Sequence, residues 1–291
     1  MPTLLDFRRR IRSVKNTQQI TRAMKFVAAA RLRRAQEAAL AARPFAKELA
    51  RVLRSIMSRI EQPEHPLLAR RPEEKILVVV LTGERGLAGA FNSNILRKAT
   101  EFFRSNKDKK LSVIPVGKKG RDTLKRAGFH FPAEYINVLA KVNFGTARDI
   151  ASVVTDLYTK EQADSVYIVF SEFKTVMTSE LALQKLLPVE PMTAAEETAE
   201  ERATAQIDYI YEQPKEVLLD RLLPRYIETQ ILRAMLESSA AEYAARMTAM
   251  ESATKNAGDV IEALTLYMNK VRQAAITKEI IEIVSGAAYG A

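Results

Sequence analysis

The chain has 291 residues, of which 47% are hydrophobic, so it can bury the core of one large domain or of two small ones. It contains no cysteine, which excludes disulfides, thiolate metal sites and cysteine nucleophiles. The net charge of +10 is concentrated at one end: residues 1–60 hold 15 Lys and Arg against three acidic residues, and the remainder has a slight negative excess. This asymmetry favours a nucleic acid, an anionic membrane or an acidic protein surface as partner over a merely solvated basic face.

Other functional classes find little support. No apolar run approaches the ~18 residues of a membrane span, and the N-terminus lacks the apolar region of a signal peptide, so we expect a soluble protein of a reducing compartment. The only two histidines, His65 and His130, are better explained as unrelated surface or loop residues than as a two-histidine metal site.

Residues 1–60 predict one long helix. Apolar residues recur in alternating steps of four and three from Phe7 to Ile60, which is the seven-residue rhythm of a coiled coil. The middle of this seam is rich in alanine, which would let a partner helix approach closely. Pro63 and Pro66 are expected to end the helix.

One stretch of this helix, "NTQQITRAMKFVAAARLRRAQ" (16–36), has five basic residues and no acidic one. The polar positions of the seam all lie in it: Gln18, Thr21 and Lys25. A second apolar set takes over there on a different face: Ile20, Met24 and Val27. A helix of this kind is expected to lie beside an acidic partner.

After a linker at 61–74, residues 75–214 predict an α/β domain. Continuous apolar runs predict buried strands at 75–81, 111–116 and 165–173. The first two are followed by a glycine-containing turn and a helical stretch, which indicates a small parallel or mixed sheet with flanking helices. The acidic stretch 190–206 is expected to be a loop, and 207–213 an edge strand.

Residues 215–291 predict a second long helix. Pro224 suits a first-turn position, so the helix is expected to run from there to about Ala287. Its seam runs from Leu236 to Ala275, and only Thr254 is polar. Such a helix, ~96 Å long at 1.5 Å per residue, exceeds a compact globule of this chain length. The natural mate is therefore the first helix, and with a domain between them the two would pair antiparallel.

The seam of this helix slips by one residue near its end. The next regular step would reach Lys278, so the apolar pattern shifts to a stripe at Ile276, Ile280, Ile283, Val284 and Ala287. We expect this stripe to contact a partner; docking onto the chain's own α/β domain is the alternative.

Catalytic motifs are absent. In "GERGLAG" (83–89) the glycines are spaced by three, without the Lys-Ser/Thr of a phosphate-binding loop, so a tight strand-to-helix turn is the default. "VGKKG" (116–120) is equally generic. No carboxylate pair, serine–histidine set or metal-spaced cluster emerges, and no cofactor is expected.

Nucleic-acid binding is the serious rival to a protein partner. The basic helix could supply phosphate contacts, and a basic coiled-coil nucleic-acid-binding protein is the alternative function. However, residues 1–60 hold only three aromatic residues, widely spaced, and no recognised docking motif.

At its two ends the chain resembles the gamma subunit of F-type ATP synthases. The resemblance is carried by "IRSVKNTQQITRAMKFVAAARLRRAQ" (11–36) and "ARMTAMESATKNAGDVIEALTLYMNKVRQAAITKEIIEIVSGAA" (245–288), and more weakly by "LTGERGLAGAFNSNI" (81–95). It covers nearly the whole chain and implies an antiparallel coiled coil with a Rossmann-like domain. The chain would then be a non-catalytic rotor subunit of a proton-translocating ATP synthase, present in one copy per complex. It would transmit torque and regulate ATPase activity and ion flow.

The resemblance also implies partners. The coiled coil would penetrate a ring of alpha and beta subunits, and the foot, with the epsilon subunit, would seat on the membrane-embedded c ring. The absence of a transit peptide favours the cytoplasmic face of a bacterial plasma (inner) membrane. Because the chain has no cysteine, the thiol switch of plant chloroplast members is excluded.

Contact residues carry over by position. Met24 and Lys25 match positions near an acidic loop of the beta subunit. A second set matches the region that faces the ring: Arg272, Gln273, Thr277, Glu279 and Glu282. The stripe that includes Ile280 and Ile283 would sit in an apolar sleeve at the top of the ring and act as a bearing.

Overall fold

The structure, a computed structural model, describes residues 3–57, 65–189 and 214–289. The chain divides into two units: Met1–Ala29 with Arg246–Ala291 form the first, and Ala30–Ala245 form the second. Two long helices, α1 (Leu4–Met57) and α6 (Lys215–Tyr289), contribute to both units. The predicted stretches 190–206 and 207–213 lie outside the described residues, as does Pro63.

The second unit contains a four-stranded sheet in the order β2-β1-β3-β4. Its strands are β1 (Lys75–Leu81), β2 (Lys110–Val116), β3 (Ser165–Phe173) and β4 (Ser179–Leu187). β1 pairs in parallel with β2 and β3, whereas β4 pairs antiparallel with β3 at one edge. The three predicted strands and the mixed sheet are therefore confirmed. β4 was not predicted, because its sequence "SELALQKLL" alternates weakly in an edge strand that is mostly half-buried or exposed.

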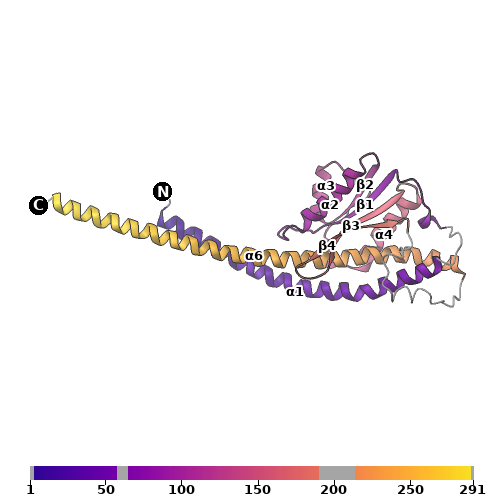
Figure 1. Cartoon of the computed structure of the whole chain (residues 1–291), viewed down its shortest axis with the longest axis horizontal. Helices are drawn as coiled ribbons and strands as arrows, with labels where there is room; N and C mark the ends of the chain where they lie inside the picture. The colour runs from indigo at the N-terminus through magenta and orange to yellow at the C-terminus, as the bar shows by residue number, and fades with distance from the viewer. Residues whose placement is uncertain (1–2, 58–64, 190–213, 290–291) are drawn as a thin grey trace. The chain divides into compact units, whose positions relative to one another are not determined.

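Helices cover both faces of this sheet. α2 (Phe91–Ser105) and α3 (Lys118–Arg126) cover one face, where Ile95, Ala99 and Phe103 form the buried side of α2. The other face packs against α4 (Phe144–Thr159), the end of α1 and the first half of α6, which together form the main hydrophobic core. In Figure 1, α1 and α6 lie side by side below the sheet. We call residues 65–189, with the sheet and α2–α4, the sheet domain.

The second helix begins earlier than Pro224, which was the predicted first turn. α6 starts at Lys215, and Pro224 lies inside it. Pro224 removes one backbone N–H, but Leu219 and Leu223 of the preceding turns are buried in the core. Burial of these side chains outweighs the lost hydrogen bond, and the helix continues through the proline.

The two helices pair antiparallel in each unit. In the first unit, the Phe7 ring lies 5.2 Å from that of Tyr267, and further along α1 Lys25 contacts Glu251. In the second unit, the guanidinium of Arg43 contacts Glu237. In both units the residue numbers of the contacts decrease along α6 as they increase along α1. The predicted antiparallel orientation is therefore confirmed.

Burial follows the predicted seams. Every seam residue from Phe7 to Ile56 on α1, and from Leu236 to Ala275 on α6, is buried or half-buried. Between Ile227 and Ala244 no side chain of α6 is exposed, because α1 and the sheet domain cover the helix there. From Ile276 to Ser285 every side chain is exposed.

Candidate interaction surfaces

The polar positions of the α1 seam meet the one polar position of the α6 seam. The Thr21 and Thr254 hydroxyl oxygens lie 2.8 Å apart, and Gln18 Nε2 donates to the Thr254 carbonyl at 3.3 Å. One turn further, Lys25 Nζ lies 2.5 Å from Glu251 Oε1. The break in the apolar pattern is therefore a matched polar layer inside the first unit.

Beside this layer the first unit has an open groove of about 690 Å³. The basic residues Arg22, Lys25 and Lys255 line it, with Glu251 as its one acidic residue. Phe26, also in the lining, is 61% exposed. Sequence reasoning singled out Lys25 but missed Arg22 and Lys255, which the geometry brings to the same groove. The charge of Lys25 is partly satisfied within the chain by Glu251, whereas Met24 is half-buried beside it on α1.

The second predicted contact set lies on the exposed part of α6. Arg272, Gln273 and Glu279 are exposed. The Thr277 hydroxyl donates to the Gln273 carbonyl at 2.9 Å, and Glu282 forms an exposed ion pair with Lys278 one turn away. These polar side chains remain accessible to a partner.

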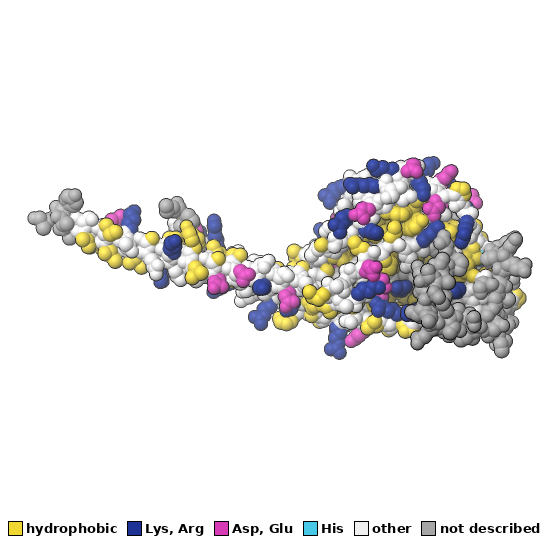
Figure 2. Space-filling view, viewed as in Figure 1, with side chains coloured by type: hydrophobic (Ala, Val, Ile, Leu, Met, Phe, Trp, Pro, Cys, Tyr) yellow, Lys and Arg dark blue, Asp and Glu magenta, His cyan; other side chains and the backbone are white. Residues whose placement is uncertain are grey.

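The apolar stripe near the end of α6 is also exposed. Figure 2 shows hydrophobic side chains at the surface towards this end of the helix. The exposed apolar side chains of this stretch are Ile276, Ile280, Ile281, Ile283 and Val284, and Ile283 is 72% exposed. Ile281 was not part of the predicted stripe, and the side chain of Ala287 lies outside the described residues. A contiguous apolar surface of this kind usually marks an interaction site.

The turn "GERGLAG" lies at the carboxyl end of β1, where α/β sheets often bind nucleotides. A Cβ on Gly83 would lie 3.0 Å from the carboxyl carbon of Glu242, so that carboxylate closes over the turn. The backbone N–H of Gly83 is already bonded to Asn92 Oδ1 at 2.8 Å. A phosphate placed here would meet a carboxylate instead of free N–H donors, which disfavours it.

The part of the chain that the structure describes offers neither a metal site nor a membrane span. There, no group of three or more His, Asp or Glu side chains could hold a metal ion. No helix among these residues is both long and apolar enough to cross a bilayer.

Comparison with known proteins identifies relatives over the whole length of the chain. The family model described as ATP synthase matches residues 3–288. The ATP synthase gamma chain of Pelotomaculum thermopropionicum is 48% identical over 288 residues, which cover 99% of each chain. That of Desulforamulus reducens is 49% identical over 288 residues, again 99% of each.

Solved structures show the same fold. A chain in the cryo-EM structure of the central stalk and c ring of the Tetrahymena thermophila mitochondrial ATP synthase has a TM-score of 0.59 at 26% identity, covering 80% of this chain and 99% of that one. A chain in the Euglena gracilis mitochondrial ATP synthase has a TM-score of 0.67 at 20% identity, covering 98% of this chain and 93% of that one.

Proposed function

The chain belongs to the ATP synthase gamma chain family, and on that premise we propose that its paired helices are the turning shaft of the enzyme's central stalk. The observation that carries this proposal is identity of 48% over 99% of both chains with a curated gamma chain. As a gamma chain it is a non-catalytic subunit of the ATP synthase. The alternative of a nucleic-acid-binding protein receives no support from these relatives.

The proposed partners follow from the stalk position. The shaft turns inside the ring of alpha and beta subunits, and the sheet domain, together with epsilon, rests on the membrane-embedded c ring. Torque then passes from proton flow to the catalytic ring, one shaft per complex. In a bacterial cell this places the chain at the cytoplasmic face of the plasma (inner) membrane.

The groove of the first unit is the proposed contact with an acidic loop of the beta subunit. The resemblance implies Met24 and Lys25 for this contact, and Arg22 and Lys255 extend it. Because Lys25 is paired with Glu251, Arg22 and Lys255 are the cations left to meet an acidic loop. Charge contact without deep interlocking suits a surface that must move past three equivalent partners.

The exposed end of α6 is the proposed contact with the upper part of the ring. Arg272, Gln273, Thr277, Glu279 and Glu282 supply polar contacts, and the stripe around Ile280 and Ile283 acts as an apolar bearing. An apolar surface without fixed hydrogen-bond partners can turn against a ring of similar chemistry.

Co-purification and activity test this function. A tagged chain expressed with alpha, beta and epsilon subunits should yield one complex with ATPase activity. Complexes of alpha and beta subunits should show rotation only when this chain is included. A chain that co-purifies with none of these subunits, or that binds nucleic acid selectively at physiological salt, would show that the assignment is wrong.

A further inference from the structure

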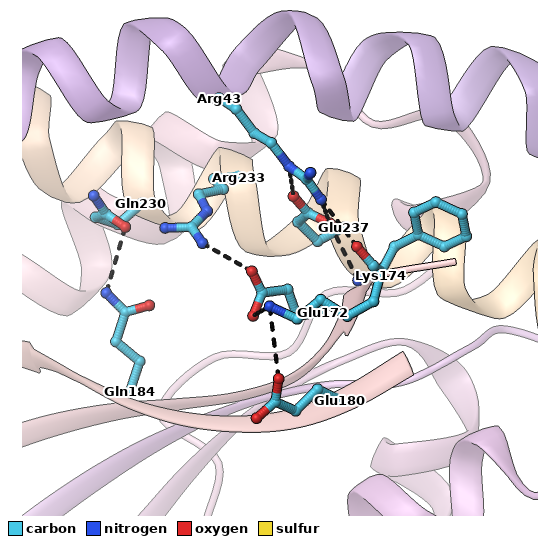
Figure 3. A network of polar contacts seen from close by, with 9 residues as sticks. Arg43, Glu172, Lys174, Glu180, Gln184, Gln230, Arg233 and Glu237 are labelled. Atoms are coloured by element: carbon cyan, nitrogen blue, oxygen red, sulfur yellow. Dashed lines mark hydrogen bonds and ion pairs between the residues drawn. The ribbon is translucent and has the colours of Figure 1, made fainter. Parts of the chain in front are cut away.

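The second unit contains a buried ionic cluster that joins three elements, seen close up in Figure 3. Arg43 of α1 donates to Glu237 of α6 through Nε at 2.7 Å and through Nη2 at 3.0 Å. The same Nη2 donates to the Phe173 carbonyl at 2.9 Å, and the Phe173 N–H donates to Glu237 Oε2 at 3.2 Å. We call Arg43, Glu237 and the backbone of Phe173 the clamp.

Among the ion pairs formed by the described residues, the clamp has the most deeply buried carboxylate. The Glu237 side chain is 0% exposed and that of Arg43 33% exposed. The hydrogen bond to Glu237 raises the pKa of Arg43 above its ordinary value, against the opposing effect of burial. A charge held out of water in this way is tolerated only when its partners are fixed in good geometry.

Through Phe173, the clamp connects the sheet to both long helices. Phe173 is the last residue of β3, where the strand leaves the sheet towards β4. Glu172, the residue before Phe173, accepts from Arg233, which lies one turn before Glu237 on α6. On β4, Gln184 donates to Gln230, which also lies on α6. A row of polar contacts along α6 thus faces the β3–β4 pair, beside the hydrophobic core.

Polar and apolar contacts resist rotation differently. Apolar side chains can repack when one element turns slightly against another, because dispersion and burial depend weakly on angle. Bidentate, charge-assisted hydrogen bonds depend strongly on direction, so rotation breaks them. In a shaft that must turn with its sheet domain, such bonds would limit slip.

We propose that the clamp is a torsional lock that makes α1, α6 and the sheet domain turn as one body. This role rests on the proposed rotor function. Arg43 and Glu237 are positioning residues in this role: they touch no substrate and act by holding the end of β3 to both helices. No local sequence pattern reveals this pair, since the two residues lie 194 positions apart.

The decisive variant removes both charges together. Arg43→Met with Glu237→Gln leaves no buried charge, and the amide oxygen at position 237 can still accept from the Phe173 N–H. Replacing a buried ion pair by neutral groups of similar size is often neutral for folding, so this chain is expected to unfold at nearly the parental temperature. Arg43→Lys keeps the charge without the two-pronged geometry. Arg33→Gln is the matched control, because it breaks an exposed pair within α1.

The measurement uses rotating complexes assembled from alpha, beta and epsilon subunits and the full chain. The chain has no cysteine, so Lys107→Cys at an exposed turn of the sheet domain allows one bead to be attached in every variant. The angular variance of the bead during pauses reports how firmly the sheet domain follows the shaft. We expect the variance to rise about twofold in the double variant, because its directional bonds are lost, and less in Arg43→Lys, with Arg33→Gln unchanged.

Two results would overturn the lock and leave the rotor function standing. Parental variance in both clamp variants would show that apolar contacts alone hold the joint. A rise equal to that of the clamp variants in Arg33→Gln would show that any loss of charge on α1 has the same effect. A parental complex that does not rotate would instead refute the rotor function, and the lock with it.

Discussion

At the scale of single residues, the sequence left His65 without a role. Its Nδ1 accepts a hydrogen bond at 3.1 Å from the Leu67 N–H, and thereby caps the short helix η1 (Pro66–Leu68). Burial lowers the pKa of His65 below its ordinary value, and the nearby Asp220 opposes this in part. The neutral ring is therefore the form that the fold needs.

This predicts a pH dependence of stability. Because the folded-state pKa of His65 lies below the unfolded value of about 6.5, the unfolded chain binds more protons in this range. The His65 cap therefore contributes to the free energy of unfolding at pH 7, and this contribution is lost as the pH falls below about 6.5. The expected loss is on the order of 1 kcal/mol, the value of the broken cap hydrogen bond. Urea unfolding at pH 7 and pH 5 measures it. His65→Asn, which keeps an acceptor, should lose less stability over that interval, and an equal loss would contradict the assignment.

At the scale of elements, the coiled-coil seams were predictable because burial repeats every 3.5 residues. Leu32 is 4% exposed, whereas Leu264 on the α6 seam is only half-buried. The same substitution should therefore have unequal effects at the two positions.

Leu32→Asp should destabilise the chain by at least the cost of truncating a buried leucine, about 2–5 kcal/mol, because it also buries an unpaired carboxylate. Leu264→Asp should cost clearly less, since its carboxylate can reach water. Chemical denaturation of both variants tests the order; Leu40→Asp, at an exposed position of α1, is the control and should change little. Equal losses at positions 32 and 264 would contradict the burial difference.

The exposed stripe at the end of α6 makes a separate prediction. Ile280→Asp with Ile283→Asp should leave the thermal stability of the isolated chain unchanged, because both side chains are already in water. Assembly with alpha and beta subunits should fall, since two charges would enter an apolar contact. Lys278→Gln, on another face of the helix and outside the proposed contacts, is the control. Loss of stability in the isolated chain would show that the stripe packs internally.

Other elements could not be predicted, for physical reasons. β4 is an edge strand with weak alternation, and the start of α6 depends on the burial of Leu219 and Leu223 against residues far away in sequence. The clamp joins residues without any local pattern, because Glu237 lies in a stretch of α6 that is covered on all sides. In the groove, Met24 and Lys25 came from resemblance, whereas Arg22 and Lys255 came from the structure. At the exposed helix end, the polar contact residues came from resemblance and the apolar stripe from the slip of the seam; all of these roles are proposals.

At the scale of the whole molecule, the α/β sheet is of a kind that often binds nucleotides. In this chain the turn after β1 does not offer the open backbone N–H groups that would bind a phosphate. Glu242 closes over the turn after β1, and Asn92 occupies the Gly83 N–H. Glu242 belongs to α6, so the turn that could have faced a nucleotide lies against a helix of the same chain.

The purified chain should therefore show no specific affinity for ATP in calorimetry, and no ATPase activity. The expected result is heat indistinguishable from dilution at millimolar ATP, because a phosphate at this turn would lie against a carboxylate. Binding in the micromolar range that Gly83→Ala abolishes would show that the turn is a phosphate site after all.

The decline of burial along α6 has a consequence for how the chain meets its surroundings. A helix of about three turns is marginal in water when nothing packs on it, and residues 276–285 have no covered side. They hold their helical form only by continuing a helix that the seam has already started, so we expect this end to fray in the isolated chain. If the proposed ring contact forms there, the ring must also order the tip, and part of the binding free energy is then spent on that ordering. Substitutions that stabilise the helix at polar positions of residues 276–285 should therefore raise the affinity of assembly without adding a contact.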